Sequence, residues 1–184
     1  MDFKSIIICI IFLVNANLYS QEDFFIYEKI QKEKVSGIEK KYNSKEEKAT
    51  VKHVSSDKNF AQPIIFSRPP TSILGKSKIY YFYSKNDAII KQISYVWNVK
   101  EMSDKEKFFE IYGREFDKIV AIISKDIDKP QSIQDIVEKE DLIETETHFE
   151  RETVWENDKC QITTLLLWSK NHNVLFTTTI NMKN

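Results

Sequence analysis

The spacing of apolar side chains changes twice along the chain, and this change constrains the fold more than any other feature. In residues 79–99 and again from residue 143 onward, apolar residues alternate with polar ones, which is the pattern of half-buried strands. In residues 103–127 they recur every three or four positions, which predicts an amphipathic helix. Ser103 and Glu106 have the spacing of a capping box and predict where this helix begins.

The strands on either side of the predicted helix follow from turn-forming residues. Residues 79–83 and 88–99 flank a short polar turn and predict a hairpin. After the helix, three alternating runs separated by polar turns predict strands at residues 149–156, 160–168 and 174–182. Residues 131–142 show no clear period, and a short helix is one interpretation of them. The order β-β-α-β-β-β predicts an α+β fold, in which one long helix packs on one face of an antiparallel sheet of about five strands.

Gly113 stands on the apolar stripe of the predicted helix, four residues after Phe109 and three before Phe116. A glycine inside a helix costs about 1 kcal/mol relative to alanine. We therefore predict that a bulky side chain of the sheet, such as Trp97, approaches Gly113 closely. In that case Gly113→Leu would destabilise the protein by overpacking.

The segment before residue 78 is polar and rich in lysine. Residues 29–58 contain nine lysines and five acidic residues, and residues 59–77 contain three prolines. These features predict a short helix near residues 23–34, followed by a weakly ordered stretch and a loop. The expected organisation is an N-terminal arm at residues 21–77 and a folded core domain at residues 78–184.

The first 20 residues have the layout of a secretory signal peptide. Lys4 precedes nine apolar residues at 6–14, and a polar stretch with small residues follows and ends at Ser20. The apolar run is too short to span a bilayer, which takes about 20 residues. Cleavage after Ser20 would make Gln21 the mature N-terminus, and cleavage after Ala16 is the alternative. We therefore expect an exported protein, periplasmic or secreted.

Composition and charge narrow the class of protein further. No later apolar segment reaches the length of a transmembrane span, so none is expected after signal cleavage. Removal of Cys9 with the signal would leave Cys160 as the only cysteine, which excludes a disulfide within the mature chain. The chain carries 27 basic and 28 acidic residues, and this balance disfavours a nucleic-acid partner. The abundance of lysine, isoleucine and asparagine points to a bacterial source.

The sequence offers no motif for catalysis, for a cofactor or for a metal. It lacks the glycine-flanked serine of hydrolases, and its three glycines stand apart from one another. Cys160 opens a predicted strand on the apolar side, where a buried thiol is the expected state. We therefore predict no catalytic, cofactor-binding or metal-binding residue.

Two groups of residues remain as candidate contact surfaces. The first group alternates along one segment and would share one face of a single strand: Glu144, Glu146, His148, Glu150 and Glu152. This row could hold a cation, attract a basic partner or the lysine-rich arm, or simply be solvated. The second group is Tyr81 and Tyr83 in the aromatic strand, whose outer face is either covered by residues 60–75 or open.

The sequence therefore predicts an exported bacterial protein without enzymatic activity, which binds a protein or a small ligand. Two alternatives stay open. One is a hydrolase that uses glutamate and histidine near residues 144–152, and the other is an envelope structural or immunity-type protein that acts in a complex. The specific ligand and the oligomeric state do not follow from the sequence.

Overall fold

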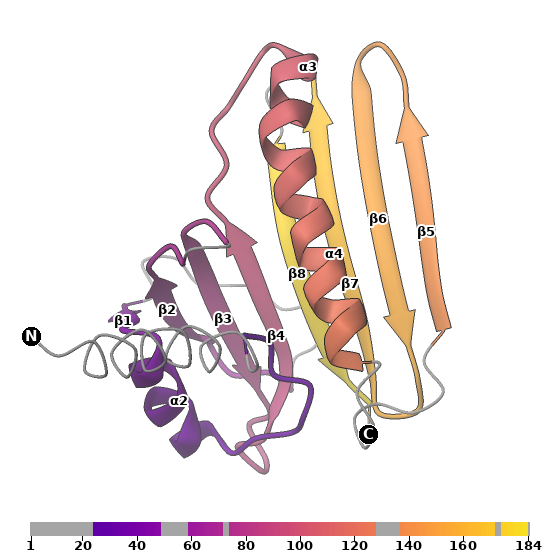
Figure 1. The fold of residues 1–184 in the computed structure, drawn as a ribbon. Coiled ribbons are helices and arrows are strands. Elements are labelled where there is room, and N and C mark those ends of the chain that lie inside the picture. The colour runs from indigo at the N-terminus through magenta and orange to yellow at the C-terminus, as the bar shows by residue number, and fades with distance from the viewer. Residues whose placement is uncertain (1–23, 49–58, 72–73, 128–136, 172–173, 184) are drawn as a thin grey trace, which may run out of the picture.

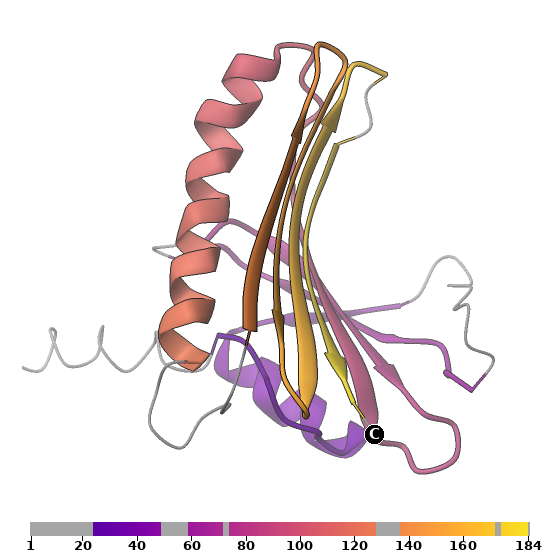
Figure 2. The same ribbon diagram turned by 90° about the vertical axis from the view of Figure 1, so that its right-hand side faces the viewer.

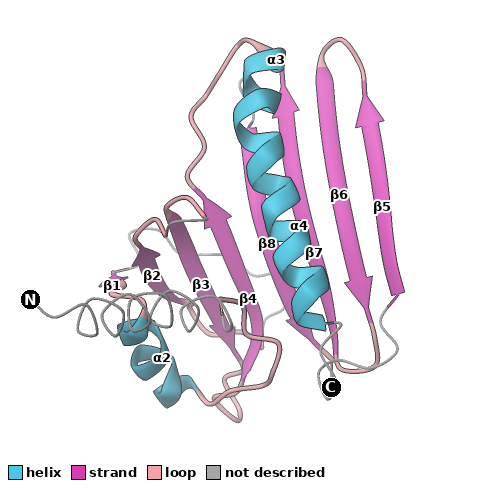
Figure 3. Ribbon diagram, in the orientation of Figure 1, coloured by secondary structure: helices cyan, strands magenta, loops and turns pink. Residues whose placement is uncertain are grey.

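The computed structural model describes residues 24–48, 59–71, 74–127, 137–171 and 174–183. This part of the chain forms one antiparallel sheet of eight strands in the order β1-β2-β3-β4-β8-β7-β6-β5, and a long helix lies along the sheet (Figures 1 and 3). The predicted α+β class and the antiparallel sheet are confirmed. The expected number of about five strands is wrong, because the sheet contains three more.

The strands are β1 (Lys45–Glu47), β2 (Ile64–Arg68), β3 (Ser77–Tyr83), β4 (Ile90–Trp97), β5 (Val137–Glu144), β6 (His148–Glu156), β7 (Cys160–Ser169) and β8 (Val174–Met182). The helical segments are η1 (Lys32–Lys34), α2 (Val35–Lys41), α3 (Lys105–Phe108), the π-helical turn η2 (Phe109–Gly113) and α4 (Arg114–Ile127).

The three additional strands come from segments whose residues did not predict strands. β1 and β2 lie within the predicted arm, where Pro63 and Pro69 flank β2 instead of interrupting it. β5 is rich in acidic residues, which have low intrinsic strand propensity, and it is held by pairing with β6 along its whole length. The helix expected near residues 23–34 lies later, in η1 and α2, and residues 24–30 contain no helix.

The long helix runs through α3, η2 and α4 and lies along one side of the sheet (Figure 2). Its apolar stripe is buried as the spacing predicted at Phe116, Ile119, Ile123 and Ile127. Nearer the start of the helix, Phe108 is buried and the predicted Phe109 is only partly buried. The N-cap is Asp104 and not Ser103, because the Asp104 side chain accepts a hydrogen bond from the backbone N–H of Lys107 at 3.1 Å. The capping box was therefore placed one residue too early.

Gly113 does not pack against Trp97. A Cβ atom built on Gly113 would meet only the ring of Phe109, at 3.9 Å, which is an ordinary contact distance. The apolar stripe runs past this position through a π-helical turn, which changes the angular spacing of the side chains there. The prediction of a tight helix–sheet approach at Gly113 is thus wrong.

One continuous core covers the helix side of the sheet. Trp97 links its two halves, because its ring lies 5.7 Å from Phe24 on one side and 5.8 Å from Phe176 on the other. Phe176 in turn contacts Phe116 of α4 at 6.2 Å. The residues before α2 and the long helix therefore cover the same face of the sheet.

In the pairing between β7 and β8, the apolar residues of the two strands lie on the same face of the sheet, as expected. The register joins Ile162 to Ile180 and Leu166 to Phe176, and all four side chains are buried. The alternate positions, including Thr163 and Thr179, lie on the opposite face, and we call this side the open face. In the part of the chain that the structure describes, no helix is both long enough and apolar enough to cross a membrane.

Candidate functional site

A hairpin turn divides the acidic segment that the sequence singled out. Glu144 is the last residue of β5, Glu146 lies in the turn, and His148 begins β6. The turn is closed by the Thr145 backbone N–H, which donates to the His148 carbonyl at 2.8 Å. It contains no glycine, proline or asparagine, so the residue pattern did not predict a turn here.

The turn also separates the predicted residues onto different faces. Pairing of Glu144 with Phe149 places Glu144 on the helix side, where its carboxylate forms an ion pair with Lys105 at 2.7 Å. His148 and Glu150 lie together on the open face, with 3.2 Å between Nε2 and Oε2. Glu152 follows two residues later on the same face. The expectation that all five residues line one face of one strand is therefore wrong.

Tyr81 and Tyr83 lie far from the acidic residues, because β4, β8 and β7 separate β3 from β6. Tyr81 is fully buried on the helix side, so it forms no part of an exposed contact surface. Tyr83 is partly buried, and the Lys32 ammonium lies 4.7 Å from its ring centre. Residues 64–68 form β2 beside β3 and pair with it, so this segment extends the sheet edge and does not cover the aromatic face.

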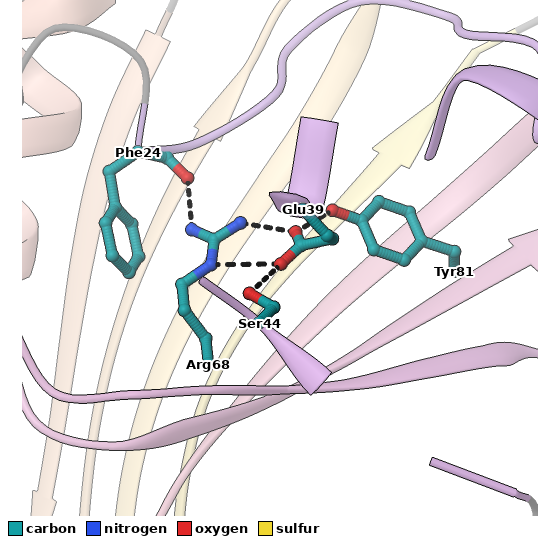
Figure 4. Close-up of polar contacts among 5 residues, drawn as sticks. All are labelled: Phe24, Glu39, Ser44, Arg68 and Tyr81. Carbon is teal, nitrogen blue, oxygen red and sulfur yellow. Dashed lines mark hydrogen bonds and ion pairs between the residues drawn. The ribbon is translucent and has the colours of Figure 1, made fainter. Parts of the chain in front are cut away.

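A buried polar network replaces the expected aromatic patch (Figure 4). Glu39 of α2 is completely buried, and its carboxylate forms an ion pair with Arg68 of β2 at 2.5 Å. The Tyr81 hydroxyl and the Ser44 hydroxyl each donate to this carboxylate at 2.5 Å. Burial raises the pKa of Tyr81 well above its usual value, and the Glu39 charge adds to the rise, so Tyr81 remains a donor.

Arg68 connects this network to the start of the described chain. Its guanidinium donates to the Phe24 carbonyl at 3.0 Å, and the same group lies 3.8 Å from the ring centre of Tyr42 and 4.7 Å from that of Phe24. The network is enclosed by aromatic rings, so it holds α2 and the Phe24 segment on the sheet and offers no place for a substrate. Sequence reasoning missed it because directly bonded members lie up to 44 residues apart in the chain.

Charge is distributed unevenly across the sheet. Residues 137–156, which form β5, β6 and their turn, carry eight acidic and two basic side chains. Residues 59–100, which contain β2, β3 and β4, carry six basic side chains and one acidic one. These segments lie at opposite sides of the sheet (Figure 1). The net charge of −1 for the whole chain therefore averages two regions of opposite sign.

The described part of the lysine-rich arm does not contact the acidic residues. Within it, η1, α2 and β1 lie at the edge of the sheet opposite β5, so this part of the arm cannot neutralise the β5–β6 hairpin. The remaining arm residues, 21–23, 49–58 and 72–73, lie outside the described residues. The predicted signal peptide, residues 1–20, and its cleavage site also lie outside them.

Cys160 has the surroundings of a structural thiol. It is fully buried at the start of β7, and burial raises the pKa of the thiol to about 11. The thiolate, which is the nucleophilic form, is therefore scarce at neutral pH. Among the described residues, no group of three or more histidine, cysteine, aspartate or glutamate side chains is placed to hold a metal ion.

Comparison of the chain with protein-family models, with curated protein sequences and with solved structures found no match.

Proposed function

We propose that this chain is an exported bacterial binding protein without enzymatic activity, and that its acidic β5–β6 hairpin docks a positively charged partner protein. The observation that carries the proposal is the excess of acidic side chains in residues 137–156, gathered at one edge of the sheet. A concentrated negative surface speeds the approach of a positive partner and selects against other partners.

The pairing of β5 with β6 adds to this support. Asp141 lies directly opposite Glu152, and both side chains are on the open face. Like charges placed opposite one another in a sheet are destabilising. Lys139 offsets part of this repulsion through an ion pair with Asp141 at 2.8 Å, but the hairpin keeps its acidic excess. A basic partner would remove the remaining repulsion when it binds.

A hydrolase receives less support from the same residues. Of the five side chains proposed for glutamate and histidine chemistry, His148 and Glu150 contact each other, whereas Glu144 faces the helix and Glu146 lies in the turn. General acid–base catalysis needs two groups that reach one reacting bond from fixed positions. The role of an envelope or immunity-type protein in a complex would use the same acidic surface and is one form of the proposed function.

Photocrosslinking in the native bacterium tests the proposal. A benzophenone amino acid replaces Leu142 of β5, which is 60% exposed, and a matched variant carries it at Ile111 of the long helix, which is 49% exposed. We expect a crosslinked exported partner with a basic surface from position 142 alone, and we expect its yield to fall as salt screens the charges. Crosslinks of equal yield from both positions, or from position 111 alone, or none at all, would contradict the proposal.

A further inference from the structure

We infer that β5 is a strand-addition site, which takes an extended segment with alternating basic side chains as a ninth strand of the sheet. This inference rests on the proposed function, because it specifies how the acidic hairpin holds its partner. In strand addition, main-chain hydrogen bonds supply much of the affinity, and alternate side chains supply the specificity.

Among the described residues, nothing pairs with the outer edge of β5, and its outward backbone groups recur at every second residue. β5 ends the sheet, and its pairing with β6 runs from Val137 to Glu144 without a shift in register. The hydrogen bond from Thr145 to the His148 carbonyl fixes the phase of this ladder. Because antiparallel partners alternate between bonded and non-bonded pairs, the outward amides and carbonyls belong to Glu138, Glu140, Leu142 and Glu144.

The β5 edge lacks several devices that protect sheet edges. Natural edge strands are commonly short, bulged, interrupted by proline or charged, and of these devices β5 has only the charged side chains. β1, at the other end of the sheet, has only three residues, whereas β5 has eight with no proline and no bulge. Leu142 and Ile143 are 60% and 53% exposed and project to opposite faces of this edge. An added strand would therefore cover apolar surface on both faces.

The charge of β5 selects the kind of strand that can be added. β5 carries four acidic residues and one lysine, so pairing with β5 of a second copy would bring like charges together. A strand with lysine or arginine at alternate positions would instead place cations beside Glu138, Glu140 and Glu144 on the helix side. Within the chain, Glu144 already pairs with Lys105 and Glu140 with Arg151, so a cation of the added strand would share these carboxylates.

Defined peptides test the inference on the whole mature protein. The probe is an alternating lysine–threonine peptide that matches the eight residues of β5. One control peptide has the same sequence with alternate amides N-methylated, which keeps the charge and removes backbone donors. A second control replaces lysine with glutamate. We expect the lysine peptide to bind at low salt, N-methylation to weaken binding about tenfold or more, and the glutamate peptide not to bind.

Two protein variants provide a matched comparison at the edge itself. Leu142→Pro removes an outward N–H without removing a bond to β6, whereas Leu142→Ala removes the same side chain and keeps that N–H. We expect Leu142→Pro to bind the lysine peptide about tenfold more weakly than Leu142→Ala does. Thermal melting of both variants shows whether the hairpin remains folded, and the N-methylated peptide tests the inference on the unaltered protein if Leu142→Pro does not fold.

The possible outcomes separate the inference from the proposed function. Equal binding of the N-methylated and unmethylated lysine peptides would overturn strand addition but leave an acidic docking surface for basic partners. Absence of binding by either basic peptide at low salt would contradict both. A dimer in sedimentation experiments that Leu142→Pro dissociates and Leu142→Ala preserves would show that a second copy occupies the edge, and it would overturn the basic partner.

Discussion

At the scale of single residues, the Glu39–Arg68 pair shows how the fold accommodates a buried charge. Both side chains are at most 1% exposed, and a charge in such a place is costly unless it is paired and fully hydrogen-bonded. The Glu39 carboxylate meets this condition, because it accepts from Arg68, Tyr81 and Ser44. The pair therefore fixes how α2 sits on β2 and β3.

Removal of both partners should cost less than the sum of the two single removals. We expect Glu39→Gln and Arg68→Met each to lower the free energy of unfolding by about 3–5 kcal/mol, because each leaves an uncompensated buried group. The double variant should lose less than the sum, with a coupling of about 1–3 kcal/mol. Urea unfolding measures these values.

A partly exposed pair on the long helix provides the control for this experiment. Glu115 contacts Lys118 at 3.1 Å, and Glu115→Gln should change the free energy of unfolding by no more than about 0.5 kcal/mol. Additive effects of Glu39→Gln and Arg68→Met would show that the two side chains do not act as a pair.

At the scale of secondary-structure elements, the long helix has two candidate N-cap residues, Ser103 and Asp104. Asp104 accepts from the Lys107 backbone N–H, whereas the sequence pattern favoured Ser103. We expect Asp104→Ala to lower the free energy of unfolding by about 1 kcal/mol, because a helix N–H loses its acceptor. Ser103→Ala should have little effect in the same unfolding experiment. The reverse order of the two effects would restore the capping box at Ser103.

Gly113 yields a prediction opposite to the one its sequence position suggested. An added methyl group would make one ordinary contact, with Phe109 at 3.9 Å. Gly113→Ala should therefore stabilise the protein by up to about 1 kcal/mol, because alanine loses less conformational entropy in a helix. Thermal or urea unfolding measures the change. A destabilised Gly113→Ala protein would indicate that the π-helical turn requires glycine.

The elements that sequence could predict are those whose own side chains define a period. The alternation in β7 and β8 and the stripe through Phe116 and Ile123 follow from burial on one side, so their positions and faces were predictable. β5 was not, because its strand form depends on pairing with β6. The placement of the acidic residues was not predictable either, because the turn before His148 contains no turn-forming residue. This turn puts Glu144 and Glu150 on opposite faces of the sheet.

At the scale of the whole molecule, the near-zero net charge is a poor guide to partners. The basic side chains of residues 59–100 and the acidic side chains of residues 137–156 cancel in the sum but not in space. An approaching partner therefore meets different local charge on the two sides of the sheet. Under the proposed function, a basic partner would approach the acidic side of the sheet.

The first described residues also limit where the predicted signal peptide can be cut. Phe24 and Phe25 are 6% and 4% exposed, and the Phe24 carbonyl accepts a hydrogen bond from the buried Arg68. Cleavage after Ser20 or Ala16 keeps both rings, whereas a cut after Phe25 would remove them and leave Arg68 without that acceptor. We therefore predict that the mature protein begins at or before Gln21 and retains this segment.

Two measurements test this prediction. Mass spectrometry of the protein from the periplasm or the medium should give the mass of a chain that begins at Gln21, and a soluble chain that retains Met1 would contradict export. Chains expressed from Gln21 and from Ile26 should differ in urea unfolding by several kcal/mol, because loss of a buried phenylalanine ring costs about 3–5 kcal/mol. A chain from Ile26 as stable as the chain from Gln21 would show that the aromatic contacts of Phe24 and Phe25 contribute little, and that the fold does not limit the cleavage site.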